Sequence, residues 1–244
     1  LFSDDWASSS IAASIAVNGE QTSWRLRLAR RFQTELNWQR GDSRVVKRIA
    51  AATSLTFERV LVDDSRIICG CADGTVVYFN RQGEEQLRFR AQHGFLSALA
   101  KSLSPPLLAA ARHDTVSIFE LHTQKLLRTL ELDAGEFMGG LALHDGTLAW
   151  ICNSKLRQSH ALTGDLFREL AFSSDLSALS VDWPSQRAAV AEFISRVWLV
   201  DLQTGDKLHT VDIAEIEQGA TSNWIQNLLF NTSDNSVFVR AGHG

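Results

Sequence analysis

The sequence repeats one twelve-residue pattern: FNRQGEEQLRFR at residues 79–90, FELHTQKLLRTL at residues 119–130 and LVDLQTGDKLHT at residues 199–210. The copies begin at Phe79, Phe119 and Leu199, so the distance between the last two is twice the distance between the first two. A repeat with a period of about forty residues is typical of proteins built from one supersecondary unit, because each copy buries its apolar face only against its neighbours. The spacing therefore decides the fold before any single residue does.

Two columns of residues keep the same register through four successive units. The matching segments begin at Thr75, Thr115, Lys155 and Arg196. A second column follows the same steps through Arg88, Arg128, Arg168 and His209. Because both columns stay in step, the segment at about residues 136–175 belongs to the same series of repeats.

Each unit alternates apolar and polar residues in short runs such as RIICGCADGTVVYFN at residues 66–80, which is the pattern of β-strands. Turn residues cut these runs at Asp73-Gly74, Gly83, Gly164 and Gly205. Four short strands in each unit predict one blade of a β-propeller. We expect an all-β chain of about four and a half blades, at about residues 56–94, 95–135, 136–175, 176–222 and, incomplete, 223–244.

The composition suits a large β core, with 45% apolar and 21% charged residues. No run of about 18 apolar residues is present, so no membrane-spanning helix is predicted. The three cysteines, Cys69, Cys71 and Cys152, stand at buried strand positions and lack the histidine pair that would complete a zinc site. We interpret them as small buried thiols of an intracellular protein, in the cytoplasm, the nucleus or both, and expect no metal or other cofactor.

The segment before the repeats is organised differently. Residues 1–20 are rich in serine and alanine and are interpreted as a weakly structured lead-in, and residues 42–244 form the predicted propeller. Within residues 21–41, Trp24, Leu28, Phe32 and Leu36 recur every four residues, which predicts a helix with one apolar face. Residues 24–50 carry eight basic and two acidic side chains, a net charge of +6, against −4 for the whole chain.

The repeats resemble WD repeats, in which a Trp-Asp pair ends the third strand. Val200-Asp201 stands at that place in the fourth unit, and Phe79-Asn80, Phe119-Glu120 and Ser159-His160 replace the pair earlier. The stretch SWRLRLARRFQTELNWQRG, residues 23–41, is similar to the linker between the F-box and the WD40-type propeller in F-box and WD-repeat proteins. The chain is identified as resembling a fragment of such a protein, without the F-box and without the last blades.

That resemblance implies a function and a way of closing the propeller. It implies the substrate-recognition subunit of an SCF-type (cullin-RING) E3 ubiquitin ligase, whose F-box binds an adaptor and whose propeller binds a degron. The degron would be a short peptide of a protein substrate, phosphorylated in many members. The strand that closes the propeller would come from Val45 to Ile49. The alternative interpretation is a generic WD-repeat scaffold in another multiprotein complex.

In a blade of four strands, the turn after the second strand and the connection after the fourth lie on one face, which this family calls the top. We expect Arg112, Lys155 and Arg196 from three successive units to form a basic patch there that binds an anionic ligand. Arginine binds phosphate and carboxylate through two parallel hydrogen bonds. The candidate binding residues on this face are Arg90, His93, Arg112, His113, Lys155 and Arg196. The resemblance also implies a hydrogen bond from His93 toward Asp114.

The same charged residues and histidines also have structural interpretations that involve neither binding nor catalysis. Charged residues in surface turns are often only solvated, and the column from Arg88 to His209 would lie on outer strands, where regular charge opposes edge-to-edge aggregation. His113 beside Asp114 is the best catalytic-looking pair, yet both fall in a predicted turn, and no nucleophile, zinc or phosphate-loop motif occurs. We therefore expect no enzyme activity. We interpret the basic helix as one that packs its apolar face between domains. We therefore expect neither nucleic acid nor a membrane as a partner.

Overall fold

The computed structural model describes residues 14–16, 56–62, 65–133, 135–193, 196–212, 223–231 and 236–243. Every regular element in these residues is a β-strand, and the strands pair into antiparallel sheets. The predicted all-β fold class is thereby confirmed. The predicted linker helix within residues 21–41 and the closing strand at Val45 to Ile49 lie outside the described residues.

The chain divides into a central unit, residues 45–171, and a terminal unit made of residues 1–44 and 172–244. The central unit holds three four-stranded sheets, each pairing its strands in chain order. Blade one is β2 (Phe57–Val62), β3 (Arg66–Cys71), β4 (Thr75–Asn80) and β5 (Glu85–Arg90). Blade two is β6 (Ala98–Leu103), β7 (Pro106–Ala111), β8 (Thr115–Glu120) and β9 (Leu126–Glu131). Blade three is β10 (Met138–His144), β11 (Thr147–Cys152), β12 (Lys155–His160) and β13 (Leu166–Ala171).

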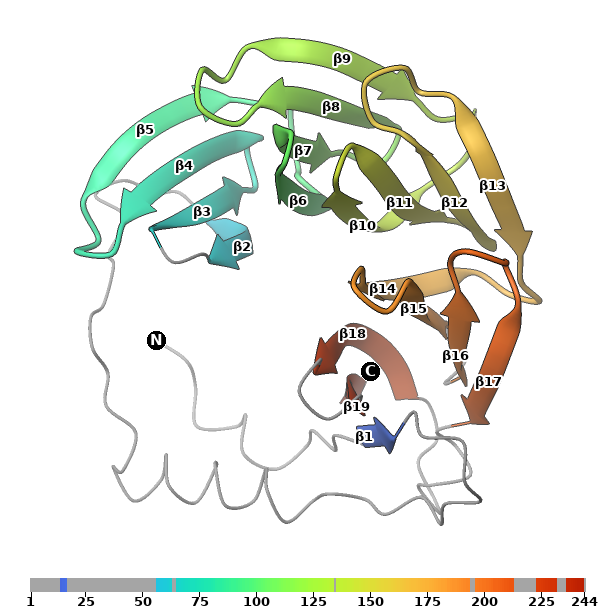
Figure 1. Ribbon diagram of the computed structural model, residues 1–244. Coiled ribbons are helices and arrows are strands. Elements are labelled where there is room, and N and C mark those ends of the chain that lie inside the picture. The colour runs from blue at the N-terminus through green and yellow to red at the C-terminus, as the bar shows by residue number, and fades with distance from the viewer. Residues whose placement is uncertain are drawn as a thin grey trace, which may run out of the picture. The chain divides into compact units, whose positions relative to one another are not determined.

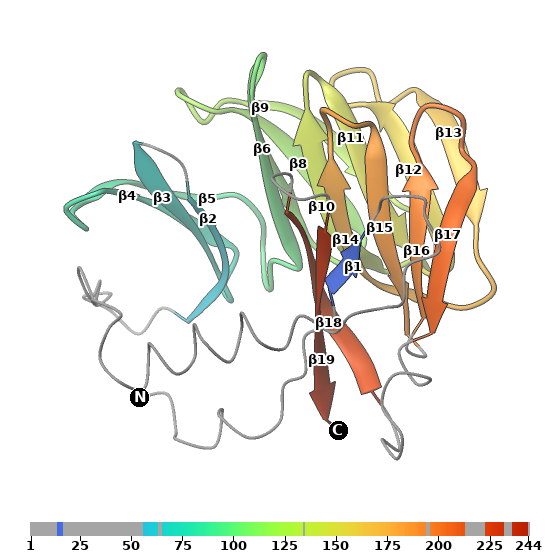
Figure 2. The same ribbon diagram turned by 60° about the horizontal axis from the view of Figure 1, so that its bottom comes forward.

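The terminal unit repeats the blade and adds a sheet of three strands. Blade four is β14 (Leu176–Asp182), β15 (Arg187–Glu192), β16 (Arg196–Asp201) and β17 (Lys207–Asp212), which run alternately in opposite directions (Figure 2). The last sheet holds β18 (Asn223–Asn231), β19 (Ser236–His243) and β1 (Ser14–Ala16), in the order β1-β19-β18. In its register Ser14 lies opposite Phe238 and Ala16 opposite Ser236. A strand from the expected lead-in thus pairs with the last strand of the chain.

Burial follows the position of each strand within its blade. The second and third strands of blades one to three are almost wholly buried, whereas the fourth strands β5, β9 and β13 are largely exposed and lie at the outer side of the central unit (Figure 1). Between blades two and three, the small Ala109 and Ala111 let Ile118 and Leu148 pack in one core cluster. Full burial of such a side chain stabilises the fold by about 1.5–3 kcal/mol.

The predicted turns are confirmed by the backbone. Gly74, Gly83, Gly164 and Gly205 have φ values of 86°, 76°, 78° and 86°, in the left-handed region that favours glycine. In the turn that ends at Gly205, the Asp201 carboxylate accepts hydrogen bonds from the backbone N–H groups of Gln203 and Thr204 at 2.7 and 2.9 Å. The aspartate of the degenerate Trp-Asp position therefore acts as a turn residue.

All three cysteines are buried free thiols, as predicted. Burial raises the pKa of Cys71 to about 11 and that of Cys152 to about 11. The pKa of Cys69 is raised by burial as well. The thiols therefore stay protonated near neutral pH and behave as small apolar core residues rather than as nucleophiles.

Candidate protein-binding face

In the central unit the turns after the second strands and the connections after the fourth strands lie together at one end of the blades, here called the top face. Backbone hydrogen bonds hold these loops to one another. They run from Ala91 N to Gly74 O (3.0 Å), from Leu132 N to Asp114 O (2.9 Å), from Met138 N to His113 O (3.1 Å) and from Asn153 N to Phe137 O (3.2 Å). Because backbone bonds fix the loops, the side chains that they carry are presented at defined positions.

Arg112 lies in the turn between β7 and β8 and is tied to its own turn. Its Nε and Nη2 donate to the two carboxylate oxygens of Asp114 at 2.8 and 2.6 Å, and its Nη1 donates to the backbone carbonyl of His93 at 3.4 Å. The hydrogen bonds from Arg112 hold the pKa of Asp114 below its usual range. The partner of the Asp114 carboxylate is thus Arg112. The resemblance to WD repeats had implied His93 as this partner.

A glutamine makes a polar link from the connection before blade two. Gln92 Nε2 donates to Ser117 Oγ at 2.7 Å and to the backbone carbonyl of Ala110 at 3.3 Å. This partly buried side chain links the connection before blade two to strands β7 and β8. The resemblance to WD repeats implied that the polar link would come from His93. The residue that makes the link is its neighbour.

Arg90, at the end of β5, lies near the turn of blade one. Its Nη2 is 3.6 Å from a carboxylate oxygen of Asp73. Asp73 also accepts hydrogen bonds from the backbone N–H and the hydroxyl of Thr75 at 3.0 and 2.9 Å. The Thr75 N–H is the main cause of the lowered pKa of Asp73, and Arg90 adds to it. Arg90 is thus paired within its own blade.

Lys155 opens β12, and its Nζ lies 3.0 Å from Glu169 Oε1 on the neighbouring strand β13. The other oxygen of Glu169 accepts a 2.6 Å hydrogen bond from Nε of Arg157. Arg157 is buried, and its Nη1 donates to Glu136 Oε2, also at 2.6 Å. Burial opposes the charge on Arg157, but the bonds to Glu136 and Glu169 outweigh it and raise the pKa of Arg157.

Arg196 opens strand β16 of the terminal unit. Its guanidinium lies 3.6 Å from Glu192 and 3.7 Å from Asp212, and it stands over the ring of Trp198 at 6.0 Å from the centroid. The four basic candidates Arg90, Arg112, Lys155 and Arg196 therefore each have an acidic neighbour in their own blade. An anionic ligand would have to compete with these carboxylates for the same donors.

The sequence interpretation missed an aromatic cluster on the top face. The His113 ring stacks on Phe95, with centroids 6.0 Å apart, and meets the edge of Phe137 at 5.9 Å. Phe95 and Phe137 come from the connections before blades two and three and are 37% and 61% exposed. Exposed phenylalanines gathered around one histidine form an apolar patch, which marks a binding surface more often than isolated apolar residues do. The sequence feature that could have indicated this cluster is a large aromatic residue in each of the two connections, Phe95 and Phe137.

Acid is expected to weaken the ion pairs of this face. Hydrogen bonds from Arg157 and Lys155 lower the pKa of Glu169 from its ordinary 4.5, as the bond from Arg112 lowers that of Asp114. A depressed carboxylate pKa stabilises the fold above the unfolded-state value, and that stabilisation is lost as the pH falls through the folded-state value. Because these groups are partly exposed, we expect a loss of only about 0.5 kcal/mol from each.

Urea unfolding between pH 7 and pH 3 measures this effect. The variant Glu169→Gln should show a smaller fall in unfolding free energy over that range than the unchanged chain. Lys101→Gln, which removes a charge elsewhere in the central unit, serves as the control. Equal pH dependence of the unchanged chain and Glu169→Gln would show that Glu169 contributes nothing to acid sensitivity.

Within the residues that the structure describes, no group of three or more histidine, cysteine, aspartate or glutamate side chains is arranged to hold a metal ion. No helix in that part of the chain is long and apolar enough to cross a membrane.

The comparisons with known proteins identify the fold. A chain in the crystal structure of a mitotic checkpoint complex matches with a TM-score of 0.64 at 14% identity, over 81% of this chain and 63% of that one. A crystal structure of the computationally designed Ika8 protein matches with a TM-score of 0.59 at 19% identity, over 79% and 60%. This chain thus spans less than two thirds of the length of the solved chains it resembles. No protein-family model and no curated protein matches the sequence.

At sequence identities this low, the structural similarity establishes only the fold. The function has to be inferred from the residues of this chain. The strand pattern, the four-stranded sheets and these likenesses together show a WD40-type β-propeller fold. A propeller of this type suggests a protein-interaction module, because rigid blades present loops at a common face.

Proposed function

We propose that this chain is a non-catalytic protein-interaction module whose top face binds a short segment of a partner protein. The observation that carries this proposal is the exposed cluster of Phe95, His113 and Phe137, held by the backbone bonds of three loops. Aromatic side chains on a rigid frame are the usual anchors of protein interfaces. In this proposal the cluster takes an apolar side chain of the partner.

In this proposal, charged candidates on the loops and strand ends of the central unit give the cluster selectivity. Arg112 adjoins His113 in the same turn and makes a bidentate contact with the Asp114 carboxylate. It would offer the same bidentate geometry to an acidic or phosphorylated residue of a ligand. Arg90, His93 and Lys155 lie on or next to the same loops. We propose that these residues of the central unit exchange their internal carboxylate partners for those of the bound segment. Arg196, at the matching position in the terminal unit, is proposed by itself to bind an anionic group.

The finer form of the proposal is a substrate-recognition subunit of an SCF-type (cullin-RING) E3 ubiquitin ligase in the cytoplasm or nucleus. It is supported by residues 23–41, whose sequence is similar to the linker that follows an F-box. In this role the chain performs no chemistry: an upstream F-box would bind the adaptor, and the top face would hold the degron. A generic WD-repeat scaffold differs from it in one respect, since it would not bind the adaptor.

The test uses the full-length protein, tagged and recovered from cells in which cullin activation is blocked so that substrates stay bound. We expect the adaptor to copurify with the unchanged protein and with Phe137→Asp. A set of partner proteins should be reduced at least tenfold in Phe137→Asp, because a charge is placed in the apolar patch. The variant Phe167→Asp, which changes another exposed phenylalanine on the outer strand β13, is the matched control.

The outcomes separate the two levels of the proposal. Absence of the adaptor from the unchanged protein would sink the ligase role and leave the interaction module. Equal recovery of every partner with Phe137→Asp, Phe167→Asp and the unchanged protein would overturn the top face as the binding site. Charge reversal at Arg112, Lys155 and Arg196 then tests the basic residues, and synthetic peptides from a recovered partner, with and without phosphate, test the need for phosphorylation.

A further inference from the structure

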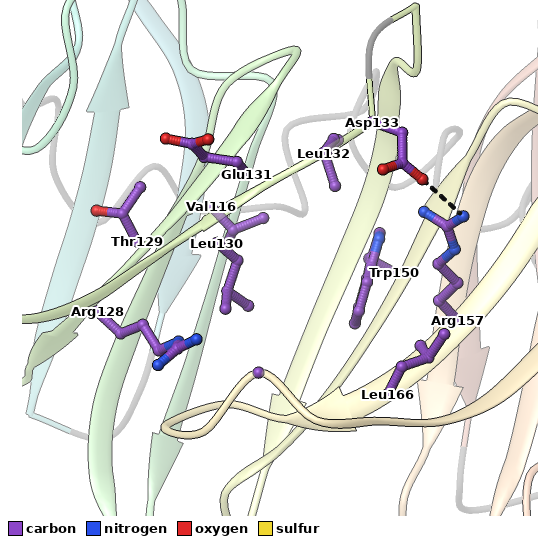
Figure 3. Close-up of a pocket in the computed structure, with 11 residues that line it drawn as sticks. Val116, Arg128, Thr129, Leu130, Glu131, Leu132, Asp133, Trp150, Arg157 and Leu166 are labelled. Atoms are coloured by element: carbon purple, nitrogen blue, oxygen red, sulfur yellow. Dashed lines mark ion pairs between the residues drawn. The ribbon is translucent and has the colours of Figure 1, made fainter.

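A groove of about 480 Å³ lies in the central unit between strand β9 of blade two and the side of blade three (Figure 3). Its size falls in the range of about 300–1,000 Å³ that is usual for ligand sites. It is lined by Val116, Arg128, Thr129, Leu130, Glu131, Leu132 and Asp133 from blade two and by Trp150, Arg157, Gly164 and Leu166 from blade three. Its walls are therefore two neighbouring blades.

The groove follows the edge of β9. Side chains of a strand alternate between its two faces, so a cavity against one face touches every second residue. This groove is lined by the consecutive residues 128–133, and so it runs along the edge of the strand. In the sheet that the structure describes, β9 pairs with β8 and has no strand on its other side. An open edge of this kind can pair with another chain.

The register of β9 shows which backbone groups face the groove. Leu132 N donates to Asp114 O at 2.9 Å, and Leu130 lies opposite Val116 in the same ladder. In an antiparallel pair, residues with N–H and C=O directed at the partner strand alternate with residues whose groups point away. Thr129 and Glu131 therefore direct their N–H and C=O groups away from β8, toward the open edge.

Blade three supplies a buried donor on the other wall. Trp150 is 6% exposed, and its indole Nε1–H has no hydrogen-bond partner in the described part of the chain. Figure 3 shows the indole standing between the β9 side chains and Arg157. A buried N–H without an acceptor is costly, and a ligand that brings a carbonyl oxygen would satisfy it.

The two ends of the groove carry opposite charge. Arg128 lies at one end, and no ion pair joins it to a carboxylate in the described residues, whereas its register equivalent Arg88 pairs with Glu85 at 2.7 Å. Glu131 and Asp133 lie at the other end, where Asp133 is exposed and 3.7 Å from Arg157 (Figure 3). Leu130 and Leu166 line the groove between them. The groove thus matches an extended segment with an acid at one end and a base at the other.

We propose that this groove binds an extended peptide segment of a partner protein, which pairs with the edge of β9 as a fifth strand of blade two. An acidic residue of the segment contacts Arg128, a large apolar residue lies over Leu130 and Leu166, and a basic residue reaches Glu131 and Asp133. A backbone carbonyl of the segment accepts the Trp150 N–H. Strand addition of this kind takes affinity from main-chain bonds and selectivity from alternate side chains. The lining of this site shares no residue with the aromatic cluster of the proposed top-face site, although its Leu132–Asp133 end adjoins the top-face loops.

The probe is a phage-displayed library of random dodecapeptides, selected on the full-length protein. Each recovered peptide is measured by fluorescence polarisation against the unchanged protein and matched variants. We expect peptides that carry an acid and a base on either side of a large apolar residue. Arg128→Glu should weaken their binding at least tenfold, and Arg88→Glu, at the register-equivalent position outside the groove, should leave it within twofold.

Two further positions test the binding mode. Thr129→Pro removes a backbone N–H that faces the groove, and Thr129→Ala keeps it, so only the proline variant should abolish binding. Proline is tolerated on an edge strand where its position faces outward. Trp150→Phe should weaken binding about 2- to 10-fold, and the Trp150 indole signal of ¹⁵N-labelled protein should shift when peptide is added.

The proposal is overturned if selection yields no peptide whose affinity falls with Arg128→Glu. It is also overturned if Thr129→Pro, shown folded by circular dichroism, binds as well as Thr129→Ala. If Thr129→Pro does not fold, the Arg128→Glu comparison and the Trp150 signal decide. Peptides that are lost with Phe137→Asp but not with Arg128→Glu belong to the top face, so failure of this site is distinguishable from failure of the proposed function.

Discussion

Replacement of Arg157 by methionine is expected to lower the free energy of unfolding by about 3–5 kcal/mol, the cost of removing one partner from a buried ion pair. The Arg157 side chain is 10% exposed, and that of Glu136 is 12% exposed. Methionine fills much of the same volume but donates no hydrogen bond. The carboxylate of Glu136 would then remain nearly buried without the guanidinium that neutralises it.

Three measurements make this expectation specific. Urea unfolding followed by tryptophan fluorescence gives the free energy for Arg157→Met, for Arg128→Met and for the double variant Arg157→Met with Glu136→Gln. The change at the exposed Arg128 should cost under about 0.5 kcal/mol. The double variant should recover part of the loss, because the uncompensated charge is gone. A loss below about 1 kcal/mol, or a double variant less stable than Arg157→Met alone, would contradict a buried ion pair.

The position of Arg157 shows what the repeat could and could not predict. The register of the four units places Val77, Ser117, Arg157 and Trp198 in one column of the third strand. The repeat therefore predicts a strand position, and the apolar members suggest that it is buried. It does not predict an arginine's partners there. Glu169 could be found from the β12–β13 hairpin, in which it lies opposite Arg157, but Glu136 comes from the preceding connection.

The candidate site, too, was predictable from the sequence in some features and not in others. Strand alternation and turn residues are local properties, so the sequence predicted the sheets, the turn that carries Arg112 and the strand ends that carry Arg90 and Lys155. Contacts between loops of different blades depend on backbone geometry that no local pattern contains. The stacking of His113 with Phe95 and Phe137 is of this kind, and so is the bond from Gln92 to Ser117. The repeat likewise does not predict the carboxylate that lies near each of Arg90, Arg112, Lys155 and Arg196.

The largest expected effect on the loops of the top face comes from Gly74→Ala, which should lower the free energy of unfolding by about 3 kcal/mol. Gly74 has φ +86°, and an added Cβ would lie 2.2 Å from the backbone oxygen of Gln92. An alanine in the left-handed region costs about 1–2 kcal/mol. Moving the Gln92 backbone also weakens the bonds from Ala91 N and Gln92 N to Gly74 O, at about 1 kcal/mol each.

Gly94 provides the matched control, because it lies in the same connection with φ +92° and nothing within 4 Å of an added Cβ. Gly94→Ala should therefore cost only the conformational part, about 1–2 kcal/mol, and the difference between the two variants measures the close approach of blade one's turn to the connection. Urea unfolding of both variants checks the difference. Equal losses would mean that the loops move apart without cost, and the top face would then lack the rigid support on which its role as a binding surface depends.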